Sequence, residues 1–232
     1  MGCRNSKHVA NDRAFLMENN PSPLTAEQIR ARTEAPQKSE VIDMGDFKMR
    51  YAYVSQRGFY PDDPRKANQD SYTAEIKLDG RKDSALFMVF DGHGKVGEKC
   101  ANFCKIHLPR NFSAELKQVN SKYSIEAAIT KSFIETNEQL HSDKAIDDSL
   151  SGTTAVGVYF QGRDIWIANV GDSRAIIVQE HEGKNVARAL SSDQTPYRKD
   201  ERERVKACGA RVMSMDQIEG IEPIHANWGD VI

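Results

Sequence analysis

A run of six apolar residues, 85–90, constrains the fold of this chain more than any other segment. Its length and large side chains, Ala-Leu-Phe-Met-Val-Phe, are typical of a strand buried in a sheet. Such a strand would deliver the residues that follow, Asp91-Gly92-His93-Gly94, to one fixed point at the sheet edge. A carboxylate at Asp91 and a backbone carbonyl at Gly92 are ligands that Mg²⁺ or Mn²⁺ takes, rather than Zn²⁺. Asp-Gly is also a common hairpin turn, and these four residues alone leave both interpretations open.

The remaining pattern predicts antiparallel strands around a pair of helices. Apolar residues that alternate or run together indicate strands over 47–56, 71–77, 153–160, 164–170, 173–179, 186–190 and 211–215. Apolar residues spaced three and four apart indicate helices over 95–110 and from Ser124 to about 140. A charged helix is expected over 198–208, closed by Gly209. The connections after residue 153 are short, which forces antiparallel pairing. We therefore expect an α+β fold rather than a doubly wound parallel sheet.

The first seven residues, Met-Gly-Cys-Arg-Asn-Ser-Lys, match the pattern for N-myristoylation at Gly2. One myristoyl chain binds a membrane only weakly, and Cys3 offers a second lipid site, for palmitoylation. Residues 1–45 are otherwise polar and proline-containing, which indicates a flexible tether, with a short helix near 26–34 behind a Thr25–Gln28 capping box. No apolar run reaches the ~20 residues of a membrane span. The sequence thus predicts a cytoplasmic protein, peripheral at the cytosolic face of a membrane.

The composition of the chain indicates which kinds of partner and which cysteine chemistry to expect. The formal net charge of −2 gives no bias toward nucleic acid. Four cysteines without a secretory signal are typical of reduced thiols, and Cys100 and Cys104 fit buried helix positions better than a metal pair. We expect a monomer without a nucleic-acid partner.

Three further clusters carry polar residues at the ends of predicted strands. Residues 65–70, Arg-Lys-Ala-Asn-Gln-Asp, offer a guanidinium at Arg65 that could clamp a phosphate and an acid at Asp70 that could hold a metal-bound water. Residues 169–174, Asn-Val-Gly-Asp-Ser-Arg, place Asp172 at the tip of a tight turn. Residues 151–155, Ser-Gly-Thr-Thr-Ala, are most simply explained by close packing between sheets. A solvated basic loop and an Asp-stabilised turn are the simpler interpretations of the other two.

Together with Asp91-Gly92-His93-Gly94, these clusters resemble, in order and spacing, the metal-dependent type 2C (PPM) protein serine/threonine phosphatases. The resemblance runs from residue 47 to the end of the chain, and the stretches 55–61 and 193–220 look like a subgroup of plants, algae and protists. It implies an antiparallel β-sandwich flanked by helices, with two Mg²⁺ or Mn²⁺ ions at one end. It also implies that phosphoserine and phosphothreonine proteins are the substrates, hydrolysed by metal-activated water.

Carried over position by position, the resemblance implies a role for each residue of the clusters. Asp91 would bridge both ions, the Gly92 carbonyl would bind one of them, and Asp70 would supply further negative charge. Asp172 matches an acid linked to an additional, weaker metal. His93 would be the general acid that protonates the leaving oxygen, and Arg65 would bind the phosphate.

The family takes at least two more metal-binding aspartates from later strands, and no matching motif precedes Ile232. We therefore expect residues 46–232 to be the N-terminal portion of a phosphatase domain, with an incomplete sandwich. Two functions follow from the sequence. One is a metal-dependent phosphatase, and the alternative is a catalytically impaired, membrane-tethered pseudophosphatase or binding module.

Overall fold

The computed structural model describes residues 24–60, 63 and 65–221. The chain divides into two compact units, the first made of residues 1–38 and 52–68 and the second of residues 39–51 and 69–232. The described part of the first unit holds helix α2 (Ala26–Arg30) and the paired strands β1 (Thr33–Glu34) and β4 (Ser55–Gln56). The Thr25 hydroxyl caps α2 and the Gln28 side chain accepts the Thr25 N–H, which confirms the predicted capping box.

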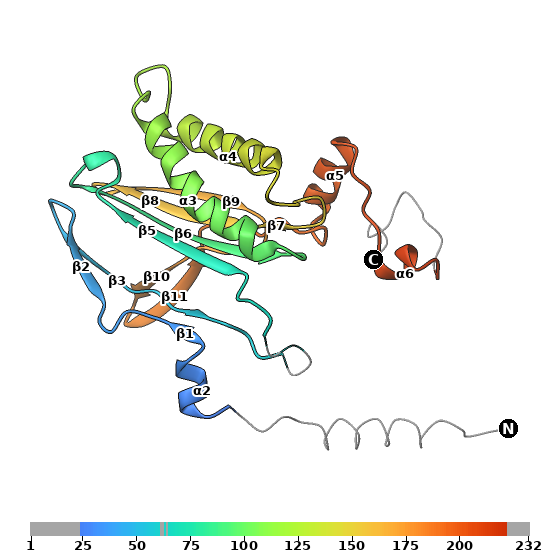
Figure 1. Ribbon diagram of the computed structural model, residues 1–232. Coiled ribbons are helices and arrows are strands. Elements are labelled where there is room, and N and C mark those ends of the chain that lie inside the picture. Colours follow the sequence, from blue (N-terminus) through green and yellow to red (C-terminus); the bar gives the residue numbers. More distant parts are fainter. Residues whose placement is uncertain (1–23, 61–62, 64, 222–232) are drawn as a thin grey trace. The chain divides into compact units, whose positions relative to one another are not determined.

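The second unit is built around a five-stranded antiparallel sheet (Figure 1). Its strands are β5 (Asp70–Ile76), β6 (Ser84–His93), β8 (Ala155–Gln161) and β9 (Asp164–Val170), in that order, with β7 (Gly152–Thr153) paired to the end of β6. Two hairpins join β2 (Glu40–Asp43) to β3 (Lys48–Tyr51) and β10 (Ile176–His181) to β11 (Lys184–Ala189). The predicted α+β fold with antiparallel strands is confirmed.

Two long helices, α3 (Gly97–Leu116) and α4 (Ile125–Ser142), lie side by side over one face of this sheet (Figure 1). The Ser124 hydroxyl caps α4 as predicted, accepting the Ala127 N–H at 3.2 Å. Helix α3 continues beyond its predicted end because Phe112 and Leu116 extend its buried stripe. The 3-10 helix η1 (Leu78–Gly80) follows β5, and the short helices α5 (Lys199–Ala207) and α6 (Met215–Ile218) follow β11.

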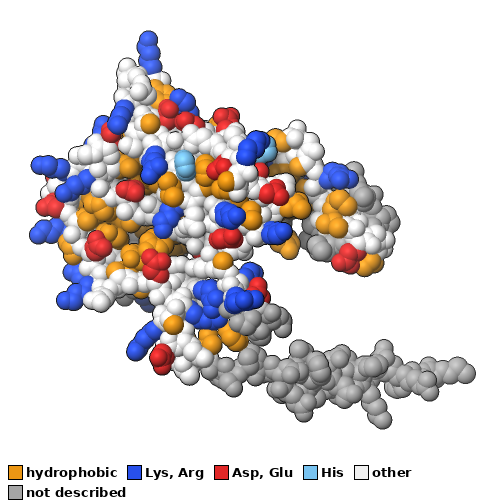
Figure 2. Space-filling model, in the orientation of Figure 1, with side chains coloured by type: hydrophobic (Ala, Val, Ile, Leu, Met, Phe, Trp, Pro, Cys, Tyr) orange, Lys and Arg blue, Asp and Glu red, His pale blue; other side chains and the backbone are white. Residues whose placement is uncertain are grey.

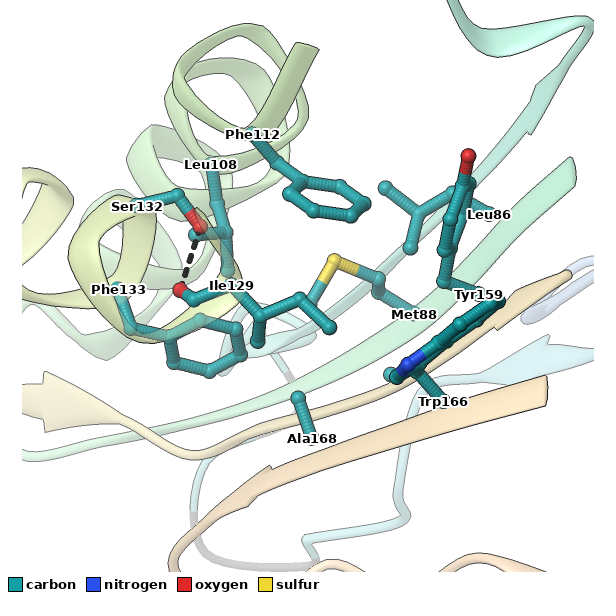
Figure 3. A pocket seen from close by; sticks show the side chains of 11 residues that line it. Leu86, Met88, Leu108, Phe112, Ile129, Ser132, Phe133, Tyr159, Trp166 and Ala168 are labelled. Carbon is teal, nitrogen blue, oxygen red and sulfur yellow. Dashed lines mark hydrogen bonds between the residues drawn. The ribbon is translucent and has the colours of Figure 1, made fainter. Parts of the chain in front are cut away.

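The core lies between the two long helices and the sheet (Figure 3). Side chains of α3, α4, β6, β8 and β9 close around a cavity of only about 20 Å³. The rings of Phe112 and Tyr159 meet edge to face, 4.9 Å apart. Burial of such side chains, about 1.5–3 kcal/mol each, fixes which side of β6 faces the helices. Because side chains alternate along a strand, Asp91 then belongs to the opposite face. His93, at the very end of β6, lines a groove together with side chains of α3 and α4.

The face of the sheet away from the helices is partly covered by the β2–β3 hairpin. There the Phe87 ring lies 5.1 Å from the Tyr51 ring and 6.0 Å from the Phe160 ring. Further along β6 on the same face, Val89 is 49% exposed and Asp91 is exposed as well. The polar end of β6 thus lies beyond the contacts that the hairpin makes.

Two predicted strand boundaries are wrong. Strand β6 does not stop at Phe90, because β7 pairs with Gly92 and His93 and extends it. The strand predicted over 47–56 is interrupted, since β3 ends at Tyr51 and β4, which belongs to the other unit, begins at Ser55.

The strand predicted over 211–215 is absent from the described residues, and α6 begins there instead. The Ser214 hydroxyl accepts the Gln217 N–H at 3.1 Å, which starts a helical turn. The strand predicted over 173–179 begins later, at Ile176, and pairs with β11 rather than β9. Before the strand begins, the Arg174 guanidinium donates to both carboxylate oxygens of Asp193, at 2.8 and 2.6 Å.

Cys100 and Cys104 are buried free thiols on α3. Burial raises the pKa of Cys104 to about 12, so this thiol is uncharged near neutral pH. Both residues therefore pack as small apolar side chains, as predicted. In the part of the chain that the structure describes, no helix has the length and apolar character needed to cross a bilayer.

The surface in Figure 2 carries acidic and basic side chains interspersed with one another. Over most of the described surface in this view neither sign dominates, and a few basic side chains gather only locally, in the lower part of the picture.

Glu115 ties the two long helices together through a polar cluster. Its side chain, one-tenth exposed, forms an ion pair with Lys131 Nζ at 2.8 Å and accepts the Tyr123 hydroxyl at 2.7 Å. The hydrogen bonds from Lys131 and then Tyr123 lower the pKa of Glu115. Because the folded pKa is below its ordinary value of 4.5, the cluster contributes its stability above that pH and loses it as the pH falls through the folded pKa.

We expect Glu115→Gln to lower the free energy of unfolding at pH 7 by about 1 kcal/mol, because a charged hydrogen-bond acceptor is replaced by a neutral one. Urea denaturation at pH 7 and at about pH 3 measures this, and the loss should shrink at the lower pH. Glu138→Gln on α4 is the matched control, because the Glu138 side chain is exposed and is not among the groups that act on Lys131. An equal loss at both pH values would contradict the proposed role of the charge.

Candidate metal centre and active site

Asp70 and Asp91 face each other across β5 and β6. They are direct cross-strand partners in the antiparallel register, on the face of the sheet away from α3 and α4. Partial burial, the negative charge of Asp91 and a hydrogen bond between the two side chains raise the pKa of Asp70. Two carboxylates held this close repel each other unless a proton or a cation lies between them. The pair therefore offers oxygen ligands to a divalent cation at the end of the sheet.

The backbone at Gly92 is packed so closely that no side chain fits. A Cβ there would lie 2.5 Å from the Gln69 carbonyl oxygen and closer still to that of Gly97. The Gly92 N–H donates to the Gln69 carbonyl at 3.1 Å, and the Gln69 side-chain amide donates to the Gly94 carbonyl at 2.7 Å. These contacts fix the end of β6 and the start of α3 beside the two carboxylates.

Thr154 holds the backbone of Asp91 from the other side. The Asp91 N–H donates to Thr154 Oγ1 at 3.0 Å, and the Thr154 N–H donates to the Asp91 carbonyl at 2.9 Å. Thr154 Oγ1 also shares a hydrogen bond of 2.6 Å with Ser173 Oγ. The methyl group of Thr154 lies against Gly171, where a Cβ would come within 2.7 Å of it. The Thr154 hydroxyl thus connects three of the four sequence clusters, residues 91–94, 151–155 and 169–174.

We expect Thr154→Val to weaken Mn²⁺ binding by about 10- to 100-fold, the usual effect of losing a residue that orients a metal ligand. The change keeps the shape of the side chain but leaves the Asp91 N–H without its acceptor. Calorimetric titration with Mn²⁺ measures the effect. Thr154→Ser, which retains the hydroxyl, should bind Mn²⁺ like the parent, and an unchanged affinity in Thr154→Val would refute the positioning role.

The His93 ring lies against Gly152 of β7. A Cβ at Gly152 would be 2.9 Å from His93 Nε2, so glycine leaves the room that the imidazole occupies. The adjacent Ser151 hydroxyl accepts the Val96 N–H at 3.2 Å and ties this segment to the loop after β6. Residues 151–154, which the sequence explained by packing alone, therefore also position His93 and Asp91.

Asp172 lies in the turn after β9, next to Ser173, and is exposed. The hydrogen bond between Ser173 and Thr154 brings this turn to the same end of the sheet as Asp91.

Arg65 belongs to the first unit, where it is exposed and its backbone N–H donates to the Asp63 carboxylate at 3.3 Å. Its role as a phosphate ligand stays a prediction.

The donors of this site are two carboxylates and the backbone at Gly92. Within residues 24–60, 63 and 65–221, no three side chains of His, Cys, Asp or Glu form a group that could hold a metal ion. Mg²⁺ usually keeps several waters and takes only one or two protein carboxylates together with substrate phosphate. An all-oxygen set of this size therefore fits Mg²⁺ or Mn²⁺ and does not fit zinc.

Residues 60–222 match the family described as Protein phosphatase 2C. The chain is 44% identical over 210 residues to probable protein phosphatase 2C 35 of Arabidopsis thaliana, an alignment that covers 90% of this chain and 59% of the relative. It is 34% identical over 191 residues to probable protein phosphatase 2C 55 of Oryza sativa subsp. japonica, covering 80% of this chain and 46% of that one. The chain spans about half the length of these curated relatives.

Solved structures share the fold. The crystal structure of serine-threonine phosphatase 2C from Toxoplasma gondii matches with a TM-score of 0.53 at 21% identity, over 62% of this chain and 51% of that chain. A Caenorhabditis elegans sex determining protein matches with a TM-score of 0.54 at 22% identity, over 65% of this chain and 37% of that chain. With its ordered motifs, its fold and its plant relatives, as the resemblance predicted, the chain belongs to the protein phosphatase 2C family.

Proposed function

We propose that this chain contributes the metal site of a phosphatase that removes phosphate from serine and threonine side chains of proteins. The observation that carries the proposal is the pairing of Asp70 with Asp91 on neighbouring strands, beside His93. The test is release of phosphate from a phosphoserine peptide by the full chain in Mn²⁺. Release that is equal with and without a metal chelator would contradict it.

Asp91, Asp70 and the Gly92 carbonyl would hold the Mg²⁺ or Mn²⁺ ions, and Asp172 would serve a further, weaker site. When bound, such ions lower the pKa of water and offset the charge that develops on the phosphoryl oxygens. The protein's part is to keep the two carboxylates fixed, which the Thr154 and Gln69 hydrogen bonds do.

His93 would donate a proton to the serine or threonine oxygen as the phosphoester bond breaks. Its ring is held against Gly152 at the end of β6, and it is exposed, so a substrate oxygen can approach it. Arg65 would bind the phosphoryl oxygens through its planar pair of donors. The alternative, a pseudophosphatase or binding module, shares these residues but requires neither metal uptake nor turnover.

We propose further that residues 46–232 form the N-terminal portion of the phosphatase domain and that residues 1–45 tether it to a membrane. Gly2 and Cys3 lie outside the described residues, and their sequence pattern is the support for lipid attachment.

Gly2→Ala should move the protein from the membrane fraction to the soluble fraction, because the acyl chain attaches only to an N-terminal glycine. Cys3→Ser should weaken partitioning as well, since a single myristoyl chain holds a membrane only marginally. Fractionation of cells that express each variant measures both. A Gly2→Ala protein that fractionates like the parent would rule out this anchor.

A further inference from the structure

A groove begins at His93 and continues along α4 to the end of β9. It has a volume of about 600 Å³, and His93 and Gly152 line one part of it. Phe133, Ile134 and Val170 line it as well, and the same three residues border a second groove of about 370 Å³. Ile134 is 56% exposed and Val170 is 49% exposed. Apolar side chains are therefore open to a ligand next to the proposed catalytic histidine.

The charged side chains of the groove are acidic. Of the described residues that line it, Glu138 and Asp148 carry charge, and neither lysine nor arginine is among them. Glu138 lies one turn after Ile134 on the same face of α4. Asp148 pairs with His141 Nδ1 at 3.0 Å, so its charge is partly offset when that histidine is protonated. The groove is thus lined by apolar side chains together with two acidic ones.

The second groove, which shares Phe133, Ile134 and Val170 with the first, follows a strand edge. β9 is the last strand of the five-stranded sheet as the described residues define it. Five consecutive residues of β9, 166–170, line the second groove, which is expected of an edge rather than of one face of a strand. A strand edge offers main-chain donors and acceptors to an extended peptide.

We propose that this groove holds the substrate segment next to the phosphorylated residue, and that it selects peptides with an apolar side chain close to a lysine or arginine. The apolar side chain lies against Ile134 and Val170, and the cation lies near Glu138. The inference rests on the proposed function, because His93 marks where the phosphoryl group reacts.

Two sets of phosphoserine peptides test this: one carries lysine or glutamine, and the other carries leucine or serine, at each position that flanks the phosphoserine. Binding to the full chain is followed by fluorescence anisotropy in a chelator, and turnover is followed in Mn²⁺. For at least one flanking position, the peptide with lysine should bind about threefold tighter than the peptide with glutamine. A gain in affinity of this size is expected of an exposed ion pair. The difference should shrink as salt rises from about 0.05 M to about 0.5 M.

Glu138→Gln should abolish the preference for lysine, and Ile134→Ser should abolish a preference for leucine over serine. Glu135→Gln is the matched control, because Glu135 is on the same helix outside the groove and its acceptor for the Gln139 amide survives the change. Equal binding of lysine and glutamine peptides, or a preference that persists in Glu138→Gln, would overturn the proposal. Selective binding without turnover would support the proposed role of the groove and refute the proposed phosphatase function. Turnover without selective binding would support the phosphatase function and refute the role of the groove.

Discussion

Asp91→Asn is expected to reduce turnover of a phosphoserine peptide in Mn²⁺ by about a thousandfold. A bound divalent ion contributes several kcal/mol to stabilising the transition state, and about 4 kcal/mol corresponds to a thousandfold in rate. The substituted side chain would leave the backbone bonds to Thr154 in place but lack the charge that pairs with the ion. Phosphate release at saturating Mn²⁺ measures the rate, and calorimetry measures whether Mn²⁺ still binds.

The same variant should be more stable than the parent when metal is absent. Partial burial, the charge of Asp91 and its hydrogen bond raise the pKa of Asp70, so between the ordinary pKa of 3.8 and the raised value the folded state holds more protons than the unfolded one. Stability therefore falls as the pH rises through this window and stays lower above it. Removing the Asp91 charge should restore about 0.5 kcal/mol at pH 7, the scale of an exposed charge pair.

Urea denaturation in a chelator tests that second expectation, and Asp164→Asn, at the far end of β9, is the control. A variant that loses turnover because it is misfolded would be less stable, not more. Unchanged turnover in Asp91→Asn, or turnover without Mn²⁺, would refute the metal-dependent function. If the parent itself takes up no Mn²⁺ and releases no phosphate, the pseudophosphatase alternative is the better description of this chain.

The two strands that carry Asp70 and Asp91 could be predicted from the sequence, because each depends on a local pattern of apolar residues. The apolar run 85–90 defines one strand, residues 71–77 define its neighbour, and a short connection makes them a hairpin. The register that sets Asp70 opposite Asp91 is seen only in the folded sheet. The helix cap at Ser124 and the capping box at Thr25 could be predicted as the strands were, because a helix cap involves residues only three apart.

The contacts that hold Asp70 and Asp91 in place could not be predicted, because they come from segments that are distant in the sequence. Thr154 is 63 residues from Asp91, and no spacing rule connects a threonine in one strand to the backbone of another. The need for glycine at Gly92 arises from the carbonyls of Gln69 and Gly97, which only the folded chain brings there. The extension of β6 to His93 likewise depends on β7, which pairs with it from beyond two helices.

The role of His93 can be tested separately by comparing substrates whose leaving groups differ. A serine alkoxide is a poor leaving group and needs a proton as the phosphoester bond breaks, whereas p-nitrophenolate leaves without one. A general acid contributes about 10²- to 10⁴-fold to a rate, and only where the leaving group requires it. A residue that merely binds metal or supports the fold would affect both substrates equally.

We therefore expect His93→Asn to lower kcat for a phosphoserine peptide by about a hundredfold or more while kcat for p-nitrophenyl phosphate falls much less. Asparagine is small enough to share the space above Gly152, and the pairing of β6 with β7 is made by the backbone, so the strand end should survive the change. Steady-state kinetics with both substrates in Mn²⁺ give the two ratios, and His141→Asn, near the end of α4, is the control. Equal losses on the two substrates would show that His93 positions the ion or the loop rather than the proton, and the general-acid role would then have to be assigned elsewhere.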